Sequence, residues 1–277
     1  MSDLKTIAAF FAHPDDEAFT CGGTLASFAA QGVEVSLVCA TRGEVGEISD
    51  SALATPETLG EVREQELVCA CNTLGINPPI FLNYRDSGMA GTPENKHPDA
   101  FMNISAAEVI RRLVRQIRHL KPQVVITFDP TGGYGHPDHI AIHHHTVAAF
   151  EAAGDPDLYP DQGEAWQADR LYYIAFPDSF FESIYQKLVE IGEDVSEMER
   201  FRDGRAGIPI DDISLIQDVA DYVQIKWDAF YCHKTQINPH SPFRKVPDDF
   251  MKQLVAKEYF ILAKPESMVG QKLATLA

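Results

Sequence analysis

Residues 6–17 read TIAAFFAHPDDE: the apolar run Thr6–Phe11 leads directly into the histidine- and aspartate-rich segment Ala12–Glu17. A short, continuous apolar run followed by turn residues is typical of a strand that is buried on both faces. Such strands occur in parallel sheets that are covered by helices on each side. The stretch therefore predicts an α/β fold with polar side chains at the carboxyl end of its first strand.

The same alternation of short apolar runs and amphipathic segments continues through residues 1–154. We expect further strands at Glu34–Cys39, Ile80–Leu82 and Val124–Phe128, and helices at Phe19–Ala30, Glu57–Leu74, Ser105–Leu120 and His139–Ala152. Gly32 and Gly75 are placed to end the first two helices, and Ser105 with Glu108 forms a capping-box pattern. This order predicts a three-layer, Rossmann-like, mostly parallel sheet with helices on both faces.

The pattern is less regular beyond Gly154. Residues 155–163 are rich in Pro, Asp and Gly and predict a loop, whereas residues 178–209 suggest a helical excursion followed by a turn. We expect strands at Leu171–Phe176 and Tyr259–Leu262, and a long helix at Ile213–Tyr231. The chain is interpreted as a single domain, residues 1–277, made of a Rossmann-like core (1–154) and a C-terminal subregion (155–277).

The composition excludes several classes of partner. The formal net charge is −18, which disfavours both nucleic acid and an anionic membrane surface, because each is bound by clustered Lys and Arg. No run of about 18 apolar residues is present, and the N-terminus does not resemble a signal peptide. An odd number of irregularly spaced cysteines suits a reducing cytoplasm rather than disulfides, with Cys69 and Cys71 packed on a helix. We therefore predict a cytoplasmic protein with a small-molecule partner.

Two clusters of histidine and aspartate follow two of the predicted strands. His13-Pro14-Asp15-Asp16 follows the first strand, and His136-Pro137-Asp138-His139 lies a short loop beyond Val124–Phe128. Ligands of open parallel sheets bind beyond the carboxyl ends of the strands, where the strand order reverses. Histidine nitrogen and aspartate oxygen are ordinary zinc ligands, and catalytic zinc takes three protein ligands. If the two strands are neighbours, both loops face one crevice and form a metal site with a spare carboxylate as general base.

The motifs resemble a known family. AHPDDE at residues 12–17 combined with HPDH at residues 136–139 is similar to the zinc-dependent N-deacetylases called PIG-L or LmbE-like. Further matches resemble the branch that acts on mycothiol and its precursors, namely the segments TRGEVGE (41–47), REQEL (63–67), YRDSGM (84–89), YG (134–135) and HKTQ (233–236). The likeness covers most of the chain and is weakest across residues 155–209.

The resemblance implies a role for each matching position. His13, Asp16 and His139 would be the zinc ligands, and Asp15 would be the base that deprotonates the attacking water. Ferrous iron also suits these ligands. His136 would stabilise the oxyanion, Asp138 would orient its imidazole, and Tyr134 would polarise the carbonyl or protonate the leaving amine. The positions that grip the sugar and its appended group are Arg63, Asp86 and, with a weaker match, Glu47.

Some residues near these motifs have a second interpretation. Glu17 suits a favourable charge at a helix N-terminus better than a metal ligand. His143 stands four residues after His139, so these two could chelate a metal together, as in HExxH sites. His233 could be structural or could contact substrate. His97-Pro98-Asp99 repeats the HPD sequence, but we interpret it as a turn.

The sequence thus predicts hydrolysis of the amide of an N-acylated amino sugar, either an N-acetylglucosaminide or a thiol conjugate. A second hypothesis keeps the metal site but adds water to a carbon–carbon double bond. A third is a non-catalytic module that binds a sugar or a nucleotide. The oligomeric state stays open, because the sequence shows no apolar pattern that could be assigned to an interface rather than to the core.

Overall fold

The computed structural model describes residues 4–199 and 207–276, and seven strands of this part form one sheet. Its order is β3-β2-β1-β4-β5-β7-β6. β1 to β5 are parallel, whereas β7 is antiparallel to both of its neighbours. The strands are β1 (Thr6–Phe11), β2 (Glu34–Thr41), β3 (Ile80–Tyr84), β4 (Val124–Thr127), β5 (Arg170–Ala175), β6 (Leu215–Asp218) and β7 (Lys257–Lys264). The predicted, mostly parallel α/β sheet is confirmed.

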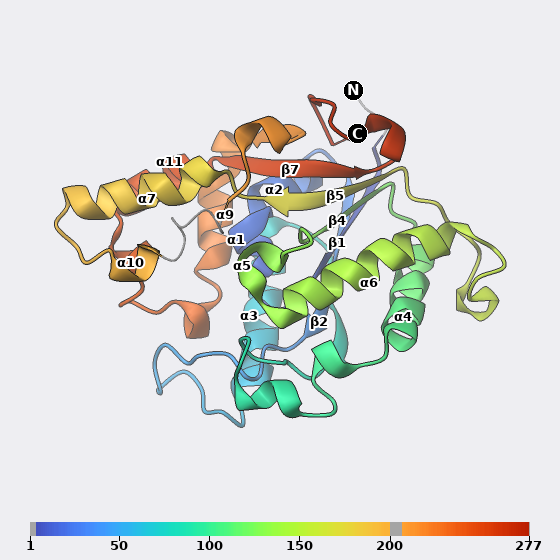
Figure 1. The fold of residues 1–277 in the computed structure, drawn as a ribbon, viewed down its shortest axis with the longest axis horizontal. Coiled ribbons are helices and arrows are strands. Elements are labelled where there is room, and N and C mark those ends of the chain that lie inside the picture. The colour runs from blue at the N-terminus through green and yellow to red at the C-terminus, as the bar shows by residue number, and fades with distance from the viewer. Residues whose placement is uncertain (1–3, 200–206, 277) are drawn as a thin grey trace.

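Helices cover both faces of the sheet (Figure 1). The order reverses between β1 and β4, and right-handed crossovers then place α4 and α6 on one face and α1, α2 and α3 on the other. α9 packs on α2 and α3. The helices are α1 (Asp16–Thr20), α2 (Gly22–Ala30), α3 (Leu59–Leu74), α4 (Ala106–Leu120), α5 (Gly132–Gly135), α6 (Pro137–Gly154), α7 (Asp178–Glu190), α9 (Val223–Phe230), α10 (Pro242–Lys245) and α11 (Asp248–Val255).

β1 lies at the centre of the core. It pairs with β2 on one side and β4 on the other, so its backbone is bonded along both edges. Ala8, Ala9 and Phe10 have no exposed surface because helices cover both faces. The apolar run that opens the chain therefore fixes the strand whose carboxyl end carries His13 and Asp16. None of the helices within the described residues is long and apolar enough to cross a membrane.

The predicted helix at Ile213–Tyr231 is wrong in its first half. Residues 215–218 form β6, which extends the sheet by pairing with β7, and the helix begins only at Val223. The Asp218 side chain accepts the N–H of Ala220 at 2.9 Å, and this turn separates the strand from the helix. Pairing with β7 outweighs the helical pattern of these residues, because that pairing is a long-range interaction absent from local periodicity.

The C-terminal residues complete the sheet of the N-terminal ones. β5, β6 and β7 all follow Gly154, yet they continue the sheet directly from β4. A second, smaller hydrophobic cluster lies beyond the sheet and is built from α7, α9 and α11, with Ile184 and Trp227 among its buried members. α7 forms the first part of the helical segment that was predicted over residues 178–209. Residues 200–206 of that segment lie outside the described part of the chain.

The expectation about the cysteines needs a correction. Cys69 is exposed on α3 and forms a disulfide with Cys232, 163 residues away, just after α9. Cys21, Cys39 and Cys71 are free and buried, as expected for small core residues. Spacing along the chain did not indicate the bridge, because only the packing of α3 against α9 brings the two thiols together.

A buried carboxylate joins β7 to the start of α2. Glu258 accepts the N–H groups of Gly23 (2.9 Å) and Thr24 (2.7 Å) and contacts the ammonium of Lys226 at 2.5 Å. Glu258 is 2% exposed. Removing one partner of a buried ion pair leaves the charge of the other partner buried and uncompensated. We expect Glu258→Ala to lower the free energy of unfolding by about 3–5 kcal/mol in urea titrations. Glu190→Ala, which removes the surface pair with Lys187, is the control; equal effects would contradict the prediction.

Candidate metal centre and active site

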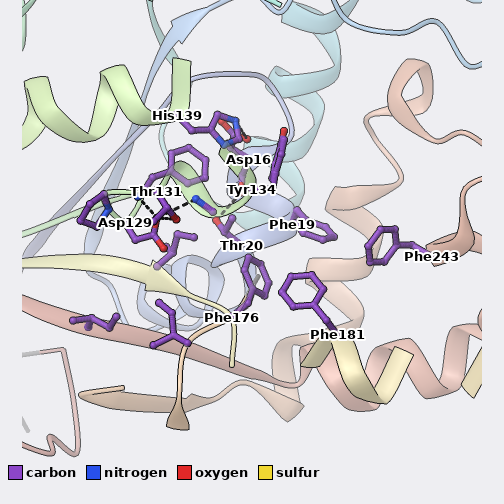
Figure 2. Close-up of a pocket in the computed structure, with 17 residues that line it drawn as sticks. Asp16, Phe19, Thr20, Asp129, Thr131, Tyr134, His139, Phe176, Phe181 and Phe243 are labelled. Atoms are coloured by element: carbon purple, nitrogen blue, oxygen red, sulfur yellow. Dashed lines mark hydrogen bonds and ion pairs between the residues drawn. The ribbon is translucent and has the colours of Figure 1, made fainter. Parts of the chain in front are cut away.

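The two predicted clusters meet at the carboxyl ends of β1 and β4, where the strand order reverses. His13 Nδ1 lies 3.1 Å from His139 Nε2, although the two residues are 126 positions apart. His13 and Asp16 come from the loop between β1 and α1, and His139 stands in the first turn of α6. Figure 2 shows Asp16 and His139 side by side at one end of a pocket, with Tyr134 next to them.

Asp16 and His139 each have one polar atom fixed by the backbone and another directed at a neighbouring side chain. Asp16 Oδ2 accepts the N–H groups of Ala12 (3.0 Å) and His13 (2.8 Å), while Oδ1 lies 3.3 Å from His139 Nε2. His139 Nδ1 bonds to the carbonyl of Gly132 at 3.1 Å. These bonds fix the orientation of both side chains, so that the remaining atoms converge on one point.

The second nitrogen of His13 faces two buried carboxylates. His13 Nε2 lies 3.3 Å from Asp138 Oδ2 and 3.5 Å from Asp86 Oδ1. Because an ionised carboxylate can only accept, these contacts favour a hydrogen on Nε2 and a lone pair on Nδ1. The expectation that the Asp138 carboxylate orients His136 is therefore corrected: this carboxylate bonds to His13 and to the N–H of Ser87 (2.9 Å).

His136 is oriented by the backbone instead. Its Nδ1 accepts the N–H of Asp138 at 3.2 Å, at the N-cap of α6, which leaves the hydrogen on Nε2. Burial, together with the nearby His13 and His139, lowers the pKa of His136 to about 3. The ring is therefore a neutral hydrogen-bond donor near neutral pH, and its centroid lies 4.5 Å from that of His13.

Two overlapping sets of three buried donors could hold a metal ion. One is His13, His136 and His139, and the other is His13, Asp86 and Asp138; within each set the donor atoms lie within 4.8 Å of one another. Both sets contain His13, so the two clusters and the Asp86 loop form one polar centre. A metal-binding capacity at this centre is consistent with the sequence prediction.

Asp15 stands beside this centre in an unusual backbone conformation. Its φ of 123° is rarely adopted by residues other than glycine, and its N–H is held by Glu17 Oε2 at 3.1 Å. Burial raises the pKa of Asp15 to about 6, although the Arg63 guanidinium opposes the shift. Arg63, which is 3% exposed, bonds to Asp15 Oδ2 (3.2 Å) and to the carbonyls of Pro14 and Gly43. The observed partners of Arg63 are thus the loops after β1 and β2 and the predicted base, Asp15.

Other candidate residues lie at different distances from the centre. Tyr134 is 58% exposed, and its ring lies edge-on to His139 with centroids 5.0 Å apart. Glu47 is an exposed residue of the loop after β2. His143 does not join His139: its Nδ1 bonds to the carbonyl of Phe128 at 2.8 Å. The HPD segment at residues 97–99 is the expected turn.

A family model described as "PIG-L: GlcNAc-PI de-N-acetylase" matches residues 8–150, just over half of the chain, and spans both clusters. The chain belongs to the PIG-L family. A relative from Rhodococcus jostii, named 1D-myo-inositol 2-acetamido-2-deoxy-α-D-glucopyranoside deacetylase, is 38% identical over 265 residues, or 91% of this chain and 89% of that protein.

Solved structures share the PIG-L fold. N,N'-diacetylchitobiose deacetylase from Pyrococcus horikoshii superposes with a TM-score of 0.65 at 20% identity, over 94% of this chain and 84% of that one. 4-Carboxy-2-hydroxymuconate hydratase from Pseudomonas putida gives 0.63 at 20% identity, over 98% of this chain and all of that one. At this level of identity, the likeness establishes the fold alone.

The C-terminal HKTQ segment supports the site through contacts that the sequence did not indicate. His233 Nε2 lies 2.8 Å from Glu17 Oε1, and both residues are fully buried, so His233 is structural and Glu17 holds the backbone of Asp15. Thr235 bonds to Glu66 through both its N–H and its hydroxyl. The available sequence signal was a Glu directly after the HPDD segment, but its partner is 216 residues away.

Proposed function

We propose that this chain is a metal-dependent hydrolase that removes the acyl group from an N-acylated amino sugar. The observation that carries the proposal is the convergence of His13, Asp16 and His139 from two loops, with Asp15 alongside. The deacetylase name of the 38% identical relative supports the reaction class. An N-acetylglucosaminyl-inositol is the first substrate to test, and a thiol conjugate of the same sugar is the second.

The donor geometry fits zinc. Donors about 2.0–2.2 Å from a tetrahedral ion lie about 3.3–3.6 Å apart. His139 Nε2 lies 3.1 Å from His13 Nδ1 and 3.3 Å from Asp16 Oδ1. The other Asp16 oxygen, Oδ2, lies 3.9 Å from His13 Nδ1 and accepts two backbone N–H groups. His136 Nδ1 already accepts a backbone N–H, and the second nitrogen of His13 is engaged by carboxylates. We therefore assign the ligand set to His13, Asp16 and His139, which would hold Zn²⁺ or Fe²⁺.

The surrounding residues supply the remaining chemistry. A bound metal ion lowers the pKa of water and polarises the amide carbonyl. Asp15, fixed by Arg63 and by Glu17, accepts the proton of the attacking water. His136 donates its Nε2 hydrogen to the oxygen that becomes negative in the transition state. Tyr134 is exposed beside His139, where its hydroxyl can polarise the amide carbonyl or protonate the departing amine.

The sugar is assigned to the side of the centre formed by the loops after β2 and β3. Asp86 follows β3, and its Oδ2 accepts the N–H of Val45, which follows β2. Glu47 lies in the loop after β2, and Arg63 donates to the carbonyl of Gly43 in the same loop. A polar sugar would find carboxylate acceptors and the Arg63 guanidinium there. We propose Asp86, Arg63 and Glu47 as sugar contacts.

The hydratase hypothesis keeps the same centre and draws only on the shared fold with the Pseudomonas putida enzyme. Acetate release from N-acetylglucosaminyl-inositol separates the two reactions, because hydration of a double bond releases no acid. One bound metal ion per chain together with catalytic turnover would exclude the hypothesis of a non-catalytic binding module. Absence of acetate from any N-acetyl sugar, with metal bound, would overturn the proposal.

His136 provides a test of oxyanion stabilisation. We expect His136→Ala to lower kcat by about 10²–10³, as loss of one oxyanion donor does elsewhere, with zinc content unchanged. His144→Ala, an exposed histidine on the same helix, serves as the control. Equal kcat values for the two variants would exclude His136 from the transition state.

A further inference from the structure

A cavity of about 450 Å³ opens next to the metal centre, on the side away from the proposed sugar contacts. Asp16 and His139 form part of its wall, and Tyr134 stands at the same end (Figure 2). The remainder is lined mainly by apolar side chains, namely Phe19, Phe176, Phe181, Phe243, Ile174 and Ile261. The aromatic rings contact one another, with centroids 5.6 Å apart for Phe19 and Phe176 and 6.0 Å for Phe176 and Phe181.

Apart from Asp16, His139 and Tyr134, the polar side chains of the wall are bonded within their own segments: Thr20 to the carbonyl of Asp16, and Thr131 to Asp129. Asp129 Oδ1 accepts the N–H groups of Thr131 (2.9 Å) and Gly133 (3.0 Å) and the hydroxyl of Thr131 (2.8 Å). Asp129 is only 7% exposed. The occupant that suits this cavity is therefore apolar, in contrast to an inositol or a second sugar.

The sheet order decides which part of the substrate reaches the cavity. The loops after β2 and β3 carry the proposed sugar contacts. The cavity is lined by the loops after β4 and β5, together with residues of α1, α7, α10 and β7. The metal centre lies between them, at β1 and β4. A scissile amide at this centre has the sugar on its nitrogen side and the acyl group on its carbonyl side. With the sugar toward β3, the acyl group points toward β5 and the cavity.

We propose that the cavity binds the acyl group, and that this chain accepts N-acyl amino sugars whose acyl group is an apolar chain longer than acetyl. This inference rests on the proposed function and names its substrate class. An acetyl methyl group would leave most of the 450 Å³ without substrate contacts. Each further methylene buried there is expected to raise kcat/KM about fourfold until the cavity is filled.

A series of substrates tests the inference. N-acetyl, N-butanoyl, N-hexanoyl and N-octanoyl forms of glucosaminyl-inositol are compared by kcat/KM with the zinc-loaded enzyme. We expect hexanoyl to exceed acetyl at least about tenfold. Hydrolysis of acetyl with equal or lower values for the longer chains would overturn the inference and leave the proposed function standing. No hydrolysis of any member would overturn both.

A second comparison tests whether the cavity binds the glycosidic substituent instead of the acyl group. Octyl N-acetylglucosaminide carries the apolar chain on the glycosidic side, and we expect it to gain less over the methyl glycoside than hexanoyl gains over acetyl. A larger gain for the octyl glycoside would assign the cavity to the aglycone and overturn the inference. Hexanoate should also inhibit acetyl hydrolysis at a concentration at least about tenfold lower than acetate does. Equal inhibition by hexanoate and acetate would contradict the inference, and this test uses the unmodified protein.

A charged side chain in the cavity should abolish the preference for long chains. We expect Phe181→Asp to lower the hexanoyl-to-acetyl ratio of kcat/KM at least about tenfold, because the chain would lie against a carboxylate. Phe250→Asp is the matched control, since Phe250 packs against the same small hydrophobic cluster but does not line this cavity. An unchanged ratio in folded Phe181→Asp would overturn the assignment.

Discussion

Asp15→Asn is expected to lower kcat for amide hydrolysis by about 10²–10⁴, the usual contribution of a positioned general base. The amide keeps the shape of the side chain but cannot take a proton from the attacking water. Asp15 lies beside the three assigned metal ligands and is not one of them, so the variant should retain one zinc per chain. Metal analysis and single-turnover kinetics measure the two quantities separately.

The repeated HPD sequence offers a matched control for Asp15. Asp99→Asn changes the same residue type in the same local sequence, but in an exposed turn, and should leave kcat unchanged. An Asp15→Asn enzyme that keeps more than about a tenth of the original kcat would assign the base elsewhere. Loss of zinc from that variant would instead make Asp15 a ligand.

His139→Ala is expected to have the largest effect on activity. It removes one of the three proposed ligands, so the metal should be lost and kcat/KM should fall by about 10⁴ or more, since both water activation and carbonyl polarisation depend on the ion. His143→Ala tests the alternative chelate one turn further along α6. Its ring bonds to the Phe128 carbonyl, so this variant should lose stability but retain zinc. Zinc loss from His143→Ala with retention in His139→Ala would reverse the assignment.

The first half of the fold could be predicted from the sequence because its signals are local. The run TIAAFF is apolar after Thr6, and it forms β1, an interior strand of the sheet. Ser105 caps α4 by accepting the N–H of Glu108, and Gly75 ends α3 in the left-handed conformation. β6 could not be predicted in this way. Its residues fit a helical pattern, and only the antiparallel pairing with β7, about forty residues later, makes them a strand.

The candidate site divides in a similar way. The two histidine–aspartate clusters at strand ends predicted that His13 and Asp16 would meet a histidine of the second loop, and the family resemblance identified that histidine as His139. The roles of the supporting residues depend on side-chain orientations that no spacing encodes. Asp138 could be predicted at the site, but not that its carboxylate turns to His13 rather than His136. The apolar cavity was equally hidden, because its walls come from segments spread between α1 and β7.

A zinc titration of metal-free protein tests the central claim most directly. Acetate and hexanoate release from the N-acyl glucosaminyl-inositols is followed as zinc is added. The account predicts release that rises with zinc and reaches a plateau at one equivalent per chain in the native protein, with neither zinc uptake nor release in the His139→Ala variant. Release that is independent of metal, or zinc bound at one equivalent without release of any acid, would contradict it.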